Sequence, residues 1–209
     1  MKTKYKITAG LVIVVLALLE KYLFLNHLNF NELLIQNLND EGLTPEQIKT
    51  SQGIQQWVVP LSLIITLLSI LIISGFLYLG TVLLNYQKNF KQIFFVVFLC
   101  ESVIIFSKFI NFIFLKMNLE HFNTTEHLKK FQVLSLQFLS PYTPTKEAIY
   151  SALGSVNLFQ IAYWFALAYG LQFVINKSYW KAFELVLYSY ISIYIFYVLG
   201  KLLFNLNFG

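Results

Sequence analysis

The segment WVVPLSLIITLLSILIISGFLYLGTVLL, residues 57–84, decides the fold class of this chain. Its 28 residues include no charged side chain. As one helix it would be about 42 Å long at about 1.5 Å per residue, whereas the hydrocarbon core of a bilayer is about 30 Å thick. The segment therefore predicts a transmembrane helix that tilts, breaks near Ser74-Gly75 or protrudes from the membrane.

The composition of the whole chain agrees with this prediction. The 209 residues are 57% hydrophobic and only 12% charged, whereas soluble domains are about 45–50% apolar and about 25% charged. Because so few charges cannot cover a water-facing surface, the lipid bilayer is the expected environment. The chain has no arginine, the side chain that most often recognises phosphate. A nucleic-acid partner is therefore not expected.

Four further apolar runs complete the predicted architecture. We expect an all-α, polytopic transmembrane helix bundle of about five spans plus short interfacial helices, in a single membrane domain. The spans are expected near residues 7–25, 57–84, 94–115, 152–175 and 182–204. The first run follows lysines, as in a signal peptide, but no small-x-small cleavage site follows it, so an uncleaved helix is expected.

Two long loops are expected outside the cytoplasm, residues 26–56 and 116–151. In the first, Thr44-Pro45-Glu46-Gln47 has the pattern of a capping box and predicts the start of a short helix. The second contains the apolar stretch Phe131–Leu139. It is too short to cross a bilayer, so it predicts an interfacial or re-entrant helix.

The lysines indicate the orientation. The amino-terminal tail and the short loops 85–92 and 176–181 together contain seven lysines and no acidic residue. The loops 26–56 and 116–151, together with Glu20, Lys21 and Lys201 near span ends, contain seven lysines and eight acidic residues. Short basic loops usually lie in the cytoplasm. We therefore expect a cytoplasmic amino terminus and insertion in an inner (plasma) membrane.

Small and hydroxyl-bearing residues recur at helical spacing and predict helix packing. Such rows let neighbouring helices approach closely in lipid. The rows are Ala162, Ala166 and Gly170 in the fourth span, and Ser62, Thr66 and Ser69 in the second. Tyr190, Tyr194 and Tyr197 share one face of the fifth span and are interpreted as packing residues that form hydrogen bonds. Cys100, the single cysteine, is expected to act as a small apolar side chain.

Glu101 and Lys108 are the main functional candidates. Both lie inside the third apolar run, where a charge costs about 2.5–3.5 kcal/mol on insertion scales. Seven residues place them on one helix face, about 10 Å apart along the axis, so we expect both to face the bundle interior. They could line a proton or ion path, with Glu184 as a further partner, or form a structural hydrogen-bond network.

Signals for catalysis and for cofactors are weak. Glu120-His121 and Glu126-His127 could supply metal ligands, but the histidines are six residues apart and match no metal motif. No phosphate-binding glycine loop, nucleophile elbow or His-Glu-x-x-His sequence is present. We therefore expect no cofactor, no metal and no enzymatic activity.

Two stretches resemble the bacterial branch of the Yip (Ypt-interacting protein) membrane family. The first is Asn89-Phe90-Lys91-Gln92-Ile93. The second runs from Val156-Asn157-Leu158-Phe159-Gln160-Ile161 through Ala168-Tyr169-Gly170-Leu171 to Lys177-Ser178 and Trp180-Lys181-Ala182. The resemblance covers about residues 57–204 and implies a five-helix bundle without known catalysis. The chain departs from the family at Glu101-Ser102, where a tyrosine and a proline are usual.

These observations leave three functional hypotheses. The first is a non-enzymatic membrane protein of Yip-like type that organises partner proteins, by association with other membrane proteins or with itself, or organises the bilayer. The second is a small transporter or channel subunit that uses Glu101 and Lys108. The third, a metal-dependent membrane enzyme that uses the His121–His127 loop, has the least support.

The predicted topology can be tested with reporter fusions. A reporter that is active only in the cytoplasm should be active when inserted within residues 85–92 and inactive when fused after Gly209, because five spans place these points on opposite sides of the membrane. Cytoplasmic activity after Gly209 would contradict the prediction.

Overall fold

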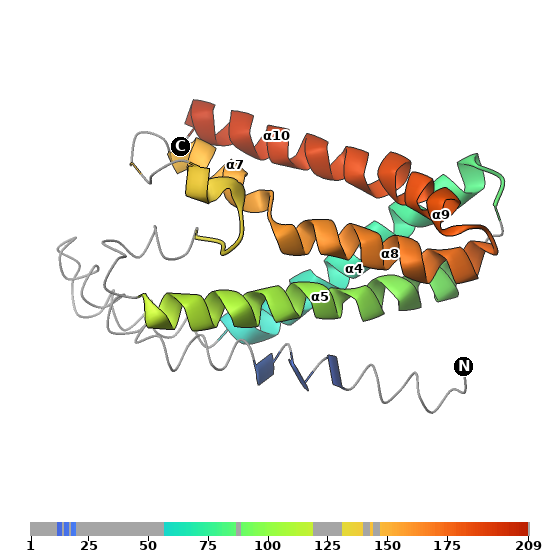
Figure 1. Ribbon diagram of the computed structural model, residues 1–209, viewed down its shortest axis with the longest axis horizontal. Coiled ribbons are helices and arrows are strands. Elements are labelled where there is room, and N and C mark those ends of the chain that lie inside the picture. Colours follow the sequence, from blue (N-terminus) through green and yellow to red (C-terminus); the bar gives the residue numbers. More distant parts are fainter. Residues whose placement is uncertain are drawn as a thin grey trace. The chain divides into compact units, whose positions relative to one another are not determined.

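The computed structural model describes residues 12–13, 15–16, 18–19, 57–86, 89–118, 131–139, 143 and 147–208. In these ranges the chain is helical or in short connections, with no strand and one isolated β-bridge (Figure 1). Most of the expected first span and the whole expected loop 26–56 lie outside the described residues, as do the two histidines of the second loop.

Two long helices come first among the fully described elements. Helix α4 comprises Val58–Leu83 and helix α5 comprises Phe90–Met117. Then come η2 (Leu136–Leu139), α7 (Glu147–Ser155), α8 (Leu158–Ile175), α9 (Tyr179–Val186), η4 (Leu187–Ile191) and α10 (Ser192–Phe208).

Four of the described helical segments are long and apolar enough to cross a membrane. They are Pro60–Leu83, Phe90–Met117, Leu158–Ile175 and Tyr179–Phe204. Four such segments, with no strand among the described residues, fit an integral membrane protein. A fifth span near residues 7–25 stays a prediction, because only six helical residues of it are described.

The chain divides into two compact units where the sequence predicts one domain. Unit 1 comprises Met1–Leu68 and Lys108–Lys129, and unit 2 comprises Ser69–Ser107 and Lys130–Gly209. In unit 1 the hydroxyl of Thr66 donates a hydrogen bond to the Ser62 carbonyl one turn earlier. The remaining contacts described below lie within unit 2.

The expected fourth span, residues 152–175, is divided at Val156-Asn157 into α7 and α8. Asn157 has an extended backbone, and its side-chain oxygen accepts a hydrogen bond from the Gln160 N–H at 2.8 Å, so it caps α8. The backbone at the break also pairs with the segment around Ser135, through Leu136 N–Val156 O and Leu158 N–Leu134 O bonds of 3.0 Å. These bonds satisfy backbone groups that a continuous helix would otherwise bond internally.

The stretch Phe131–Leu139 does not form the expected interfacial or re-entrant helix. It contains a turn and the four-residue 3-10 helix η2. The side chain of Gln137, only 2% exposed, holds the stretch together: its oxygen accepts from Gln132 N at 2.7 Å and its nitrogen donates to Tyr150 O at 3.0 Å. Gln132 in turn donates to the Ser107 hydroxyl of α5. Long-range polar contacts therefore replace the local helix.

The last span contains a π-helical segment. Helix α9, the π-helix η4 and α10 follow one another without a break, and both the backbone N–H and the hydroxyl of Ser192 donate to Leu187 O, five residues earlier. Such π segments occur mostly as single turns within α-helices, frequently at functional sites. Here the segment places Ser189, Tyr190 and Ile191 in the interior of unit 2.

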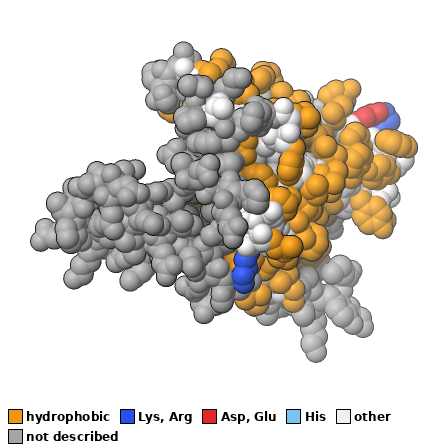
Figure 2. Space-filling view, turned by 60° about the vertical axis from the view of Figure 1, so that its left-hand side comes forward, with side chains coloured by type: hydrophobic (Ala, Val, Ile, Leu, Met, Phe, Trp, Pro, Cys, Tyr) orange, Lys and Arg blue, Asp and Glu red, His pale blue; other side chains and the backbone are white. Residues whose placement is uncertain are grey.

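The core of unit 2 is apolar, and its outer surface is apolar as well. Buried side chains from α4, α5, α8 and α9 form one cluster, which includes Leu77, Val97, Tyr163, Leu171 and Leu185. Figure 2 shows one face, where the described side chains are mostly hydrophobic and few are charged. Large apolar side chains both inside and outside are expected of helices surrounded by lipid.

Gly80 is the point at which α4 comes closest to the last span. A Cβ atom there would overlap the Ser189 side chain and would lie 2.7 Å from Leu185 Cδ1. Small residues permit such approaches between transmembrane helices. The contact therefore depends on the absence of a side chain at position 80.

We predict that Gly80→Ala destabilises the protein, by about 1–3 kcal/mol, because the added methyl forces neighbouring groups to move. Gly75→Ala on the same helix is the control: a Cβ there meets nothing within 4 Å, so the better helix propensity of alanine should leave stability unchanged or raised. Unfolding of purified protein in detergent measures both. Equal stability of the two variants would show that α4 does not approach Ser189 this closely.

Candidate functional site: a buried polar cluster around Glu101

Glu101 lies in the middle of α5 and is only 9% exposed. Tyr163 on α8 and Tyr190 on the π segment lie near enough for the negative charge of its carboxylate to act on their hydroxyl groups. Three separate helical elements therefore bring polar groups toward one point inside unit 2. We call Glu101, Gln160, Tyr163 and Tyr190 the Glu101 cluster.

The two tyrosines of the Glu101 cluster are held in fixed positions. The Gln160 side-chain nitrogen donates a hydrogen bond to the Tyr190 hydroxyl at 3.1 Å. The rings of Tyr163 and Tyr190 meet edge to face, with centroids 5.8 Å apart. Edge-to-face ring pairs add about 0.5–1.5 kcal/mol beyond their burial. Polar and aromatic contacts together therefore fix the last span against α8.

The hydroxyl of Tyr163 is the unusual group of the cluster. Tyr163 is 1% exposed, and its hydroxyl has no hydrogen-bond partner. A buried polar group without a partner costs about 1–3 kcal/mol. This hydroxyl therefore has spare hydrogen-bonding capacity toward a proton, a water molecule or a small ligand.

Lys108 and Glu184 do not belong to the Glu101 cluster. Lys108 is half-buried on α5 and belongs to unit 1. Glu184 lies on α9 and forms an exposed ion pair with Lys181, at 2.8 Å. Of the three functional candidates from the sequence, only Glu101 belongs to the cluster. Glu184 pairs with Lys181, its neighbour on α9.

The predicted packing row on α8 is used unevenly. Gly170 lies against Val96 of α5, where a Cβ atom would crowd the valine side chain. Ala166 packs against the core cluster, whereas Ala162 is exposed. On α4, Ser69 is exposed. The close helix contact is therefore restricted to one end of the α8 row.

The tyrosine row of the last span makes the hydrogen bonds that its packing interpretation requires. Tyr190 bonds with Gln160, and the Tyr194 hydroxyl donates to Ser155 O at 2.6 Å. Tyr194 also meets the Trp164 ring edge to face. Tyr197 continues the row of rings but is exposed. The first two tyrosines thus connect α10 and η4 to α7 and α8.

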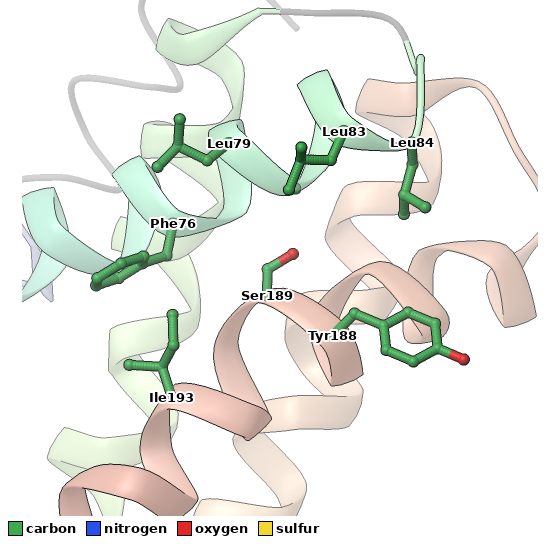
Figure 3. A pocket seen from close by; sticks show the side chains of 8 residues that line it. Phe76, Leu79, Leu83, Leu84, Tyr188, Ser189 and Ile193 are labelled. Carbon is green, nitrogen blue, oxygen red and sulfur yellow. The ribbon is translucent and has the colours of Figure 1, made fainter.

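A groove lies elsewhere on unit 2, between α4 and the π segment (Figure 3). Its volume is about 310 Å³. Its walls are Phe76, Leu79, Gly80, Leu83, Leu84, Tyr188, Ser189 and Ile193. The groove is separate from the Glu101 cluster in its lining residues, although Ser189 and Tyr190 are adjacent in the π segment.

The sequence did not point to Gln160, Tyr163 or the groove. Gln160 and Tyr163 lie three residues apart on α8, so one face of the helix presents both. That spacing was a usable signal for a polar face. The groove gave no such signal, because its walls come from two segments more than a hundred residues apart.

No metal site is formed by the residues that the structure describes, among which no group of three or more His, Cys, Asp or Glu side chains could hold an ion. The His121–His127 loop is outside those residues. Comparisons with protein-family models, curated proteins and solved structures found no match for the chain.

We predict that Gln160 and Tyr190 stabilise the fold jointly. A double-mutant cycle with Gln160→Leu and Tyr190→Phe should give a coupling of about 0.5–1.5 kcal/mol, because either change alone leaves one buried polar group unpaired. The measurement is unfolding in detergent. Gln172→Leu is the control, since this glutamine donates to the Tyr169 carbonyl and its effect should add to that of Tyr190→Phe. A cycle with zero coupling would rule out the hydrogen bond.

Proposed function

We propose that this chain is a non-enzymatic integral membrane protein whose helix bundle organises partner proteins or the surrounding bilayer. The four long apolar helices make membrane integration the basis of the proposal. A bacterial inner-membrane location with a cytoplasmic amino terminus is part of it and rests on the lysine distribution of the sequence.

The observation that carries the proposal is the use of polar groups inside unit 2. Most of them bond to the protein itself: Ser74 donates to Ile70 O, Thr81 to Tyr78 O and Ser189 to Leu185 O. Gln160 and Tyr190 bond to each other. Groups bonded in this way stabilise helices and helix contacts, and they are not available to bind a substrate. This supports a structural or organising role over a catalytic one.

The outer surface supports the same role. Along α4, large apolar side chains are exposed on successive turns, and α10 has others. Such surfaces suit contact with lipid or with the helices of a neighbouring protein, either another membrane protein or a second copy of this chain.

We further propose a relationship to the Yip family. This proposal rests on the sequence resemblance, and several of the residues that carry it have identifiable structural positions. Asn157 caps α8, Gly170 contacts α5, and Ala182 is fully buried in α9. The departure at Glu101-Ser102 coincides with the Glu101 cluster, so this feature would distinguish the chain from the family.

A second function is a small transporter or channel subunit. The specific observation in its favour is the Tyr163 hydroxyl, buried without a partner near Glu101. Ionisable groups inside a membrane bundle frequently mark proton or ion pathways. In this version Glu101 would take up and release a proton, and Tyr163 and Tyr190 would pass it along.

Co-purification separates the two functions. The protein is extracted in mild detergent, and proteins that remain bound are identified by mass spectrometry. A specific, stable partner is the result expected for the organising role. Purified protein is also placed in liposomes with a pH-sensitive dye inside. Proton flux above that of empty liposomes, without a partner, would reject the first proposal in favour of the second.

Substitution of Glu101 gives a matched test. We predict that Glu101→Gln keeps the unfolding temperature and the partner, because the amide retains hydrogen-bonding capacity at similar volume. Glu101→Leu should lower stability by about 1–3 kcal/mol, because it removes polar contacts from the cluster. If Glu101→Gln keeps the fold but abolishes a pH-dependent activity, Glu101 carries protons and the structural interpretation fails.

A further inference from the structure

The groove on unit 2 has apolar walls and no free polar group at its base. Figure 3 shows Phe76 and Ile193 at one end, Leu84 and Tyr188 at the other, and the Ser189 side chain between α4 and the π segment. The Ser189 hydroxyl donates to Leu185 O at 2.7 Å, so its hydrogen is already used. The walls therefore match a hydrocarbon chain better than a polar ligand.

The groove also opens at the surface of candidate spans. Leu79 is 56% and Leu83 is 81% exposed, and both belong to the Pro60–Leu83 span. Tyr188 and Ile193 belong to the Tyr179–Phe204 span. Once these spans lie in a bilayer, the open side of the groove faces lipid.

Positive charge lies at one end of the groove. Lys181 is exposed on α9, seven residues before the wall residue Tyr188 of the same continuous helix, so the two side chains lie about two turns apart on one face. Lys177 is exposed four residues before Lys181, and Lys91 is exposed in the first turn of α5, next to Phe90, whose ring meets Tyr78 of α4 edge to face. Glu184 forms an ion pair with Lys181 and offsets one of these positive charges. The three lysines therefore leave a net positive charge.

We propose that the groove binds one acyl chain of an anionic phospholipid, with the lipid phosphate beside Lys181. Basic side chains at the ends of transmembrane helices attract anionic headgroups, and the apolar walls continue from them into the membrane. The volume is near the lower end of small-molecule pockets, about 300–1,000 Å³. A whole helix, about 10 Å or more in diameter, is too wide. The inference is independent of the proposed function.

The experiment compares the retention of two lipids from one mixed membrane. The full chain is reconstituted in nanodiscs with equal parts phosphatidylglycerol and phosphatidylcholine, extracted in mild detergent, and examined by native mass spectrometry for bound lipid. Wild type should retain phosphatidylglycerol over phosphatidylcholine by about fivefold, the effect expected of one lysine near the headgroup. Leu79→Trp, which fills the groove, should reduce retention of both lipids. Ile72→Trp, on the same helix outside the groove, should not.

Lys181 and Glu184 provide a pair of opposite effects. Lys181→Gln should abolish most of the preference, whereas Glu184→Gln should increase it, because Lys181 then no longer shares its charge with a carboxylate. A merely structural ion pair would make the two variants alike. Lys116→Gln, an exposed lysine on α5 in unit 1, is the control and should match wild type.

Three outcomes would overturn the proposal. The first is equal retention of the two lipids by wild type. The second is the same loss in the Lys181→Gln and Glu184→Gln variants. The third is a wild-type dimer that becomes a monomer in Leu79→Trp, which would make the groove a contact between copies. Loss of all lipid only in Leu79→Trp, with the preference shifted in opposite directions by the two charge variants, would support it.

Discussion

Within the hydrocarbon of a membrane, each backbone N–H and carbonyl must find its partner inside the protein, because no water is available to replace it. Continuous helices meet this requirement by themselves. The chain departs from it at Val156-Asn157, and there the segment around Ser135 supplies the missing backbone bonds while the Asn157 side chain caps α8. The described stretch Phe131–Leu139 is therefore part of the packed structure of unit 2.

The same requirement shapes the interior of unit 2. Hydroxyl side chains on α4 and the π segment donate hydrogen bonds to backbone carbonyls of their own helices, so they need no partner on another helix. Side chains that do bond across elements include those of the Glu101 cluster, where Gln160 of α8 donates to Tyr190 of η4, and Tyr194 of α10, which donates to Ser155 O of α7. Any role for Glu101 therefore depends on the Glu101 cluster, which also holds the last span against α8.

Much of the architecture could be predicted from the sequence, because a transmembrane helix is encoded by local composition. Residues 57–84 and 94–115 fall within or close to α4 and α5 for this reason. The division of 152–175 could not be predicted, because its cause lies twenty residues earlier, at Ser135 and Gln137. The stretch Phe131–Leu139 is apolar enough for a helix, yet the buried Gln137 amide draws its backbone into long-range contacts.

The candidate site, too, could be predicted only in part from the sequence. Glu101 stands out in any apolar sequence, since a charge there needs an explanation. Gln160, Tyr163 and Tyr190 do not stand out, because such residues are common on helix faces and only the fold brings these three together. Glu184, named as a further partner of Glu101 and Lys108, pairs with Lys181, which lies one turn away and carries the opposite charge.

The π segment has a consequence for how the last span tolerates change in length. A π turn contains one residue more than the α turn it replaces, and one residue corresponds to about 100° of rotation around an α-helix. The side chains of α10 are therefore rotated relative to the face that α9 would have continued, and Tyr190 and Tyr194 meet α8 and α7 only with that rotation. A regular α-helix of the same sequence would turn Tyr194 about 100° away from its partner, whereas loss of one residue between Leu187 and Ile191 would allow a regular helix that keeps Tyr194 in its present direction. The extra residue thus sets the phase between the two halves of the span.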